Sequence, residues 1–196
     1  MNEHAPSRIQ ARGLDWPPAR RFSADEFERM AEAGILTRDE RVELIAGEIV
    51  VMSPKGRAHE VLRSELAFRW SRFAPPHIKV ASESPLRLAD SSEPIPDLFV
   101  FPSHLVAPDV RYDTALLVVE IADSSDSYDR VSKAQLYAAS GIVEYWVVNA
   151  RTLVTTIHRD PAGDGYGESF DVPGDRPVTP RLAPELSVRM AEVARD

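Results

Sequence analysis

Two apolar runs, at residues 116–121 and 144–149, constrain the fold of this chain more than any other feature. Continuously apolar strands are typical of the centre of a sheet that is covered on both faces. Residues 130–139 between them have helical character, and Gly141 provides a helix end. A strand, a helix and a strand with short connections form a right-handed crossover, which places the strands parallel. The sequence therefore predicts an α/β fold.

The N-terminal part of the chain predicts a helix followed by a hairpin. Ser23 and Glu26 have the spacing of a capping box, in which each side chain bonds to the backbone of the other. Gly34 then marks the end of the helix. Two short apolar strands at residues 42–45 and 49–52 are separated by a tight turn, which is the pattern of a β-hairpin.

The central part predicts a long helix and then a series of strands. Residues 57–73 repeat apolar side chains every three or four positions, as in a helix that packs on a sheet. These side chains are Ala58, Val61, Leu62, Leu66, Trp70 and Phe73. Further strands are expected at residues 78–81, 85–88, 97–101 and 153–158, with an edge hairpin beyond residue 160. The sheet is therefore expected to be mixed, with helices flanking it.

The length of 196 residues fits one domain, expected at residues 22–192, with a mobile arm at 1–21 and a tail at 193–196. The absence of cysteine excludes disulfides, thiolate metal sites and a cysteine nucleophile. No apolar run approaches the roughly 20 residues that span a bilayer, and the first residues lack the pattern of a secretory signal. A cytoplasmic location, with no membrane contact, is the expectation.

The formal net charge of −8 argues against nucleic-acid binding by bulk electrostatics. However, the stretch from Lys55 to Lys79 carries six basic residues against two acidic ones. Two interpretations remain open for it, a surface that faces phosphates and an ordinary solvated helix face.

Two acidic residues fall next to neighbouring predicted strands. Asp97 opens one strand, and Glu120 lies near the end of the next. A single acid in such a place is most often a turn or salt-bridge residue. Two carboxylates that converge at one end of a sheet would suit an oxygen-ligand metal such as Mg²⁺ or Mn²⁺.

Lys133 is unusual because the chain has only three lysines against twenty arginines. Lysine is a compact charge with a tunable pKa, suited to positioning a hydroxide or stabilising a phosphorane. Asp129 and Tyr137 lie four residues before and after it, so all three can share one helix face. The alternative is an ordinary surface ion pair between Asp129 and Lys133.

Two further residues are weaker candidates. Strand alternation points Glu43 away from its apolar neighbours, so an exposed acid is the simpler interpretation. His59, at the start of the basic helix, is a candidate contact for a phosphate or a metal. The sequence has no G-x-S-x-G turn and no glycine-rich phosphate loop, which disfavours hydrolase triads and nucleotide cofactors.

Taken together, the motifs resemble the Uma2 family, whose members are described as restriction-endonuclease-like proteins of the PD-(D/E)xK nuclease superfamily. The resemblance extends from about residue 21 to residue 192. The segments that carry it are residues 42–48, Met52-Ser53-Pro54 with His59, Pro96-Asp97-Leu98, residues 118–121, Tyr128-Asp129-Arg130 with Lys133 and Tyr137, and residues 141–148.

The resemblance implies a restriction-endonuclease-like core in which Asp97 and Glu120 hold a divalent metal, with the Ile121 carbonyl as a further ligand. The superfamily's usual lysine position, two residues after the second acid, is Ala122 here. Lys133 would take that role from the following helix. Glu43 matches an additional acidic position that helps to hold a second ion.

The leading hypothesis is therefore a Mg²⁺- or Mn²⁺-dependent endonuclease that cleaves DNA, with Lys55, Arg57 and His59 as nucleic-acid contacts. A homodimer is expected by analogy with enzymes that cut both strands of a duplex. One alternative is a non-catalytic binding or assembly module that retains the fold. Another is a nuclease acting on RNA, or an enzyme for a non-nucleic phosphodiester.

Overall fold

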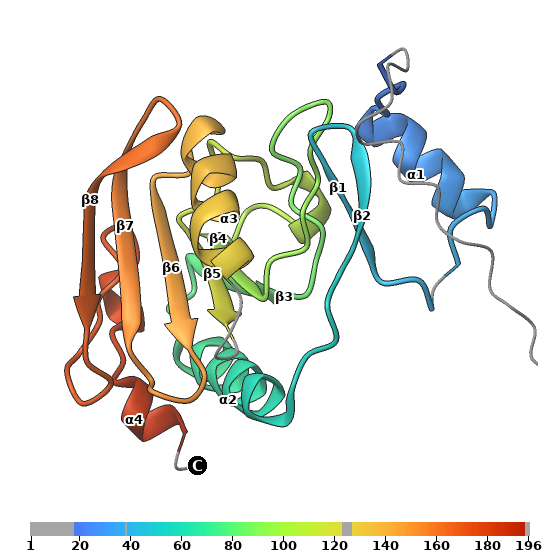
Figure 1. Ribbon diagram of the computed structural model, residues 1–196. Helices are drawn as coiled ribbons and strands as arrows, with labels where there is room; N and C mark the ends of the chain where they lie inside the picture. Colours follow the sequence, from blue (N-terminus) through green and yellow to red (C-terminus); the bar gives the residue numbers. More distant parts are fainter. Residues whose placement is uncertain (1–17, 38, 123–126, 195–196) are drawn as a thin grey trace, which may run out of the picture.

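The computed structural model describes residues 18–37, 39–122 and 127–194, except for the side chains of residues 127–131. The helices of this part are α1 (Ala24–Glu32), α2 (Arg57–Phe73), α3 (Ser127–Ala139) and α4 (Met190–Val193). Its strands are β1 (Val42–Ile45), β2 (Glu48–Val51), β3 (Ile78–Ser82), β4 (Leu98–Pro102), β5 (Leu117–Ala122), β6 (Glu144–Asn149), β7 (Thr155–Ala162) and β8 (Gly165–Val172). Strands β3 to β8 form the main sheet in sequence order, and β1 and β2 form a separate hairpin (Figure 1).

The crossover unit has the predicted arrangement. Strands β5 and β6 pair in parallel, whereas the other neighbouring pairs of the main sheet are antiparallel. Helix α3 connects β5 to β6 and packs on one face of the sheet, and α2 packs on β3 and β5 (Figure 1). The α/β class and the mixed sheet with flanking helices are thus confirmed.

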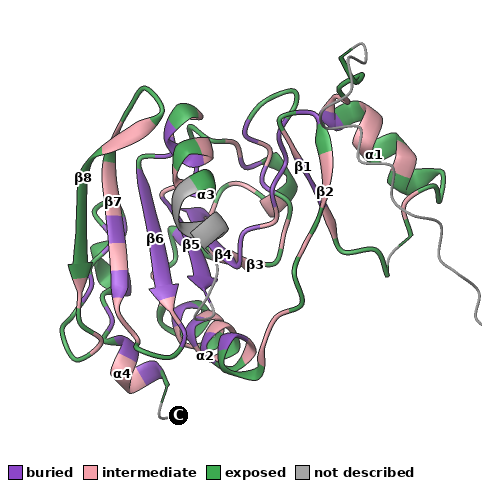
Figure 2. Ribbon diagram, in the orientation of Figure 1, coloured by how far each residue is buried: buried purple, intermediate pink, exposed green. Residues whose placement is uncertain are grey.

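Two apolar layers enclose β5, all six residues of which are buried (Figure 2). On one face, Leu117, Val119 and Ile121 pack with the buried stripe of α2. On the other face, Val118 and Ala122 pack with Tyr137 of α3. The core also holds large aromatic side chains, since Trp70, Tyr145 and Trp146 are all buried. Glu120 is therefore a charged residue in the most enclosed strand of the molecule.

Three details of the predicted elements are corrected. Helix α2 has the predicted bounds, but Ala58, Val61 and Phe73 are exposed, because its buried stripe runs through His59, Leu62, Leu66 and Trp70. Residues 85–88 do not form a strand; within them, Arg87 makes an isolated bridge to Arg111. Helix α3 begins three residues earlier than predicted.

The hairpin and α1 form as the sequence indicates. Ser23 and Glu26 make the reciprocal bonds of a capping box. The turn between β1 and β2 places both Ala46 and Gly47 at positive φ, which is the geometry that a two-residue hairpin turn requires. A Cβ on Gly47 would lie 2.6 Å from the Cβ of Arg21, so glycine is needed there for space as well as for conformation.

The division into arm, domain and tail stays a prediction, and most of the predicted arm lies outside the described residues. Val193, which the prediction places in the tail, is buried in the core beside α2 and β5. Among the described helices, none is long and apolar enough to cross a membrane.

A buried carboxylate fastens the C-terminal segment to the sheet. Glu144, at the start of β6, is 1% exposed. Its oxygens accept hydrogen bonds from Trp146 Nε1 at 2.9 Å, Arg159 Nε at 2.9 Å and the backbone N–H of Arg181 at 2.6 Å. These donors come from β6, β7 and the segment after β8, so one side chain connects three parts of the chain.

We expect Glu144→Ala to lower the free energy of unfolding by about 3 kcal/mol or more, because it leaves a partly buried guanidinium and an indole N–H without their acceptor. Urea denaturation followed by circular dichroism measures this loss. Glu168→Ala is the control, since Glu168 makes an exposed pair with Arg181 and its removal should change stability by less than about 1 kcal/mol. Equal losses in the two variants would contradict the assigned role of Glu144.

Candidate active site

The register of two antiparallel strands brings Asp97 and Glu120 together. Leu98 of β4 pairs with Val119 of β5, so the next position along the ladder sets Asp97 opposite Glu120. Opposite residues of an antiparallel pair share a face, with Cβ atoms about 5 Å apart. The backbone N–H of Ile121 donates to Asp97 Oδ2 at 2.7 Å, which fixes this arrangement. The predicted convergence of the two acids is thus present in the structure.

Glu120 meets two donors from consecutive turns of α3. Lys133 Nζ lies 2.9 Å and Tyr137 Oη 2.9 Å from Glu120 Oε1, and both side chains are buried. Positions four apart share a helix face, so α3 delivers both donors to one carboxylate oxygen. Burial, and then the charge of Glu120, raise the pKa of Tyr137 well above its ordinary value, so the phenol stays protonated as a donor. The predicted partner Asp129 has a side chain outside the described residues.

Asp97 is held by three donors. Its Oδ2 contacts His59 Nε2 at 2.9 Å as well as the Ile121 N–H, and its Oδ1 accepts from Lys55 Nζ at 2.5 Å. Burial by itself would raise the pKa of Asp97, but the bond from His59 and the charge of Lys55 outweigh it and lower the pKa to about 2. Asp97 is therefore ionised at neutral pH. Since an ionised carboxylate only accepts, Nε2 of His59 carries the hydrogen.

The interpretation of Glu43 as an exposed acid is wrong. Glu43 is 3% exposed, because β1 packs against the segment before β4, where Leu44 bridges to Glu93. Glu43 Oε2 accepts from the N–H of Ile95 at 3.2 Å and lies 3.6 Å from Lys133 Nζ. Lys133 thus lies between two carboxylates, one on β1 and one on β5.

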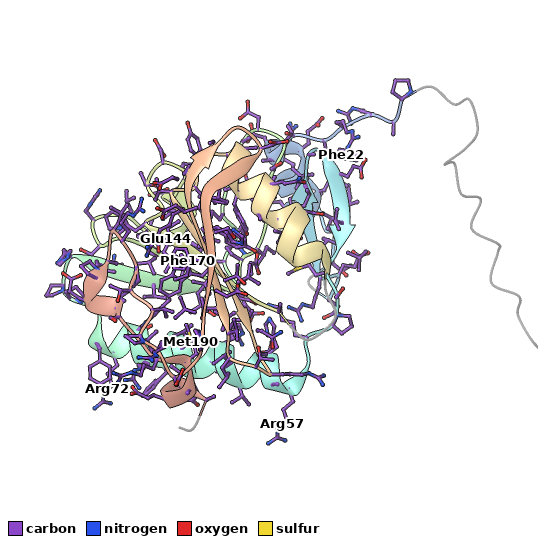
Figure 3. The ribbon with its side chains drawn as sticks, turned by 60° about the vertical axis from the view of Figure 1, so that its left-hand side comes forward. Phe22, Arg57, Arg72, Glu144, Phe170 and Met190 are labelled. Atoms are coloured by element: carbon purple, nitrogen blue, oxygen red, sulfur yellow. The ribbon has the colours of Figure 1, made fainter. Side chains whose placement is uncertain are left out.

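These residues line one pocket between the hairpin, the start of α2 and the ends of β4 and β5. It has a volume of about 110 Å³. Its ionisable lining residues are Glu43, Lys55, His59, Asp97, Glu120 and Lys133, and Ile121 also contributes. Arg57 is exposed and does not line the pocket; its side chain points away from the body of the protein (Figure 3). The structure therefore brings together all of the predicted site residues except Arg57.

Glu83 is a residue of this region that the sequence interpretation missed. It follows β3 with a φ of 49°, a left-handed conformation that is costly for a residue with a side chain. Its Oε1 lies 3.0 Å from Lys55 Nζ and 3.3 Å from Arg41 Nη2, and its N–H donates to the carbonyl of Asp97. Nothing in the surrounding sequence distinguishes Glu83 from an ordinary loop acid, because its partners are distant in the chain.

The pocket offers carboxylate and carbonyl oxygens, which are the ligands that hard divalent cations prefer. Among the described residues, no three Asp, Glu or His side chains form a cluster that could hold one metal ion. Mg²⁺, however, is commonly held by one or two carboxylates, with water and substrate oxygens completing its shell. Asp97, Glu120 and the Ile121 carbonyl could supply that smaller protein share. In this structure each of the two carboxylates is bonded to an ammonium group.

Comparisons with known proteins concern the fold and the family of the chain. A crystal structure described as "a putative nuclease belonging to DUF820 from Anabaena variabilis" superimposes with a TM-score of 0.69 over 89% of this chain and 98% of that chain, at 19% identity. At this identity the likeness shows a shared fold. No curated protein matches the chain. The model of one family, Uma2, described as "Putative restriction endonuclease", matches residues 24–191. Because that match covers most of its length, the chain belongs to the Uma2 family.

Proposed function

We propose that this protein is a divalent-metal-dependent endonuclease that hydrolyses phosphodiester bonds in DNA. The observation that carries the proposal is the pair of acids, Asp97 and Glu120, which the register of β4 and β5 sets opposite each other in one pocket beside the buried Lys133. The nuclease fold of the structural neighbour and the description of the family support it.

In this proposal Asp97, Glu120 and the Ile121 carbonyl hold Mg²⁺ or Mn²⁺, and Glu43 is the acid available for a second ion. A divalent ion supplies two effects here, polarisation of the phosphodiester and a lower pKa for a bound water. A water oxygen would form a bond to phosphorus while the bond to the 3′ oxygen breaks. The proton lost by the water passes to solvent, and the leaving 3′ oxygen takes up a proton from solvent.

The protein side chains position these groups and balance their charges. Lys133 and Tyr137 hold Glu120 Oε1, and His59 and the Ile121 N–H hold Asp97 Oδ2. Lys133 also provides fixed positive charge where negative charge develops on the phosphate. Lys55 and His59 line the pocket and are the expected phosphate contacts, whereas the outward Arg57 would meet a flanking part of the nucleic acid.

One observation favours a second candidate, a binding or assembly module without catalysis. Each acid is already paired with a lysine, and both carboxylates belong to a buried hydrogen-bonded cluster. Buried polar networks of this kind can be kept because they specify a fold. The two candidates differ in whether Asp97 and Glu120 bind metal.

We expect the wild-type protein to nick supercoiled plasmid in Mn²⁺ or Mg²⁺, and Asp97→Asn and Glu120→Gln to lower the rate by about 100-fold or more. Each variant removes a charged ligand, and metal-ion stabilisation of a transition state is worth several kcal/mol. Gel assays measure nicking, and isothermal titration calorimetry of Mn²⁺ on the same samples measures binding.

Glu168→Gln, at an exposed acid on β8, is the matched control and should keep full activity. Single-stranded DNA, RNA and bis(p-nitrophenyl) phosphate assayed in parallel separate a DNA enzyme from the other phosphodiesterases. A wild-type protein that neither binds Mn²⁺ nor cleaves any of these substrates would exclude the nuclease and leave the binding module.

We expect Tyr137→Phe to lower the cleavage rate by about tenfold while changing the midpoint of thermal unfolding little. The variant removes the donor to Glu120 Oε1 but keeps the ring, whose centroid lies 4.8 Å from that of Tyr145. Groups that orient a metal ligand typically contribute 10- to 100-fold. Tyr166→Phe is the control, because that hydroxyl donates to the carbonyl of Ile142 and lies outside the pocket. Equal rates for the two variants would assign Tyr137 a packing role alone.

A further inference from the structure

We propose that the Lys55 ammonium group and the divalent cation exclude each other on Asp97, so that Lys55 acts as a built-in competitor that the metal must displace. The inference rests on the proposed metal site and adds to it a residue that sets its affinity. In this proposal the Lys55 ammonium leaves the Asp97 carboxylate when the divalent ion binds.

The hydrogen bonds of Asp97 show which of its two carboxylate oxygens can bind a metal ion. Oδ2 already accepts two hydrogen bonds, from His59 Nε2 and from the backbone N–H of Ile121. Two bonds fill the acceptor capacity of one carboxylate oxygen. Oδ1 is therefore the oxygen that can bind a metal ion in the pocket. Lys55 Nζ contacts this same oxygen at 2.5 Å.

Simultaneous binding of both cations to Oδ1 is unfavourable. Mg²⁺ lies about 2.1 Å from its ligand oxygens, so an ammonium nitrogen at its present distance would be only a few ångströms from the ion. The side chains of Lys55 and Asp97 are only 11% and 2% exposed, and like charges in such a place repel strongly because solvent screens them little. A lysine ammonium carries its positive charge at neutral pH, and Lys55 here pairs with both Asp97 and Glu83.

The structure also provides an alternative partner for the displaced ammonium. Lys55 Nζ already lies 3.0 Å from Glu83 Oε1. Glu83 is fixed beside Asp97 through its N–H bond to the Asp97 carbonyl, and it is more exposed than Asp97. Lys55 can therefore leave Asp97 while keeping an ion pair, at the rim of the pocket where a substrate phosphate would enter.

The test is Mn²⁺ affinity, measured by isothermal titration calorimetry on full-length protein without nucleic acid. We expect Lys55→Met to bind Mn²⁺ about tenfold more tightly than the wild type, which is a moderate effect for removing a charge-assisted hydrogen bond. Lys55→Gln serves as a second variant, and the thermal unfolding of each is recorded to show that it is folded. Lys79→Met is the matched control, since Lys79 is an exposed lysine on β3 outside the pocket.

Two further arms separate direct competition from a general effect of charge. At an ionic strength of about 0.5 M, long-range electrostatics are screened, and the gain in the Lys55 variants should persist. Adding Asp97→Asn to Lys55→Met should abolish the gain, because the competed ligand is then absent. A gain that survives in this double variant would place the ion elsewhere and overturn the proposal.

The remaining outcomes distinguish this inference from the proposed function. If wild type and Lys55→Met bind Mn²⁺ equally, the competition is refuted while the metal site stands. If neither binds, the metal site and the competition both fall. If only the Lys55 variants bind detectably, the competition is supported in its strongest form.

Discussion

A carboxylate in the fully buried central strand requires a cationic partner, and this requirement connects the layers of the molecule. An ionised group without a partner in an apolar layer costs several kcal/mol. Glu120 of β5 meets Lys133 from α3, and Lys133 in turn approaches Glu43 from the hairpin. Sheet, crossover helix and hairpin therefore meet at one ammonium group, and their relative positions determine the shape of the pocket.

The site exists only in the complete fold, because its groups come from several elements. Asp97 immediately precedes β4, Glu120 lies on β5, Lys133 and Tyr137 lie on α3, and His59 lies in the first turn of α2. The β4–β5 register and the helical spacing of α3 set most of the geometry, and both are properties of rigid elements. Sites built on such elements hold their side chains more precisely than sites built on loops.

The parts of the fold that were predictable from sequence are those with a local pattern. The β5–α3–β6 unit follows from two apolar runs around a helix, and the α1 start follows from a capping box. The burial of Glu43 has no such pattern, because alternation assigns side chains to two faces without saying which face is covered. The contact of Glu83 with Lys55 and that of Lys133 with Glu120 could not be predicted from the sequence either, because both join separate segments of the chain.

The cations that pair with Asp97 and Glu120 are lysines, and a lysine suits a contact that can be exchanged for a metal ion. The chain uses arginine for twenty of its 23 lysine and arginine side chains, and the partly buried Arg159 contacts Glu144 Oε1 through both Nε at 2.9 Å and Nη2 at 2.8 Å. The planar fork of arginine offers five fixed donors and binds carboxylates bidentately, whereas lysine is a point charge on a flexible stem. Lys55 and Lys133 each occupy one oxygen of an acid with their nearest contact. An ammonium held by one such contact can be exchanged for a metal ion at lower cost than a guanidinium held by two, so the lysines offset the charge of Asp97 and Glu120 without closing the pocket to an ion.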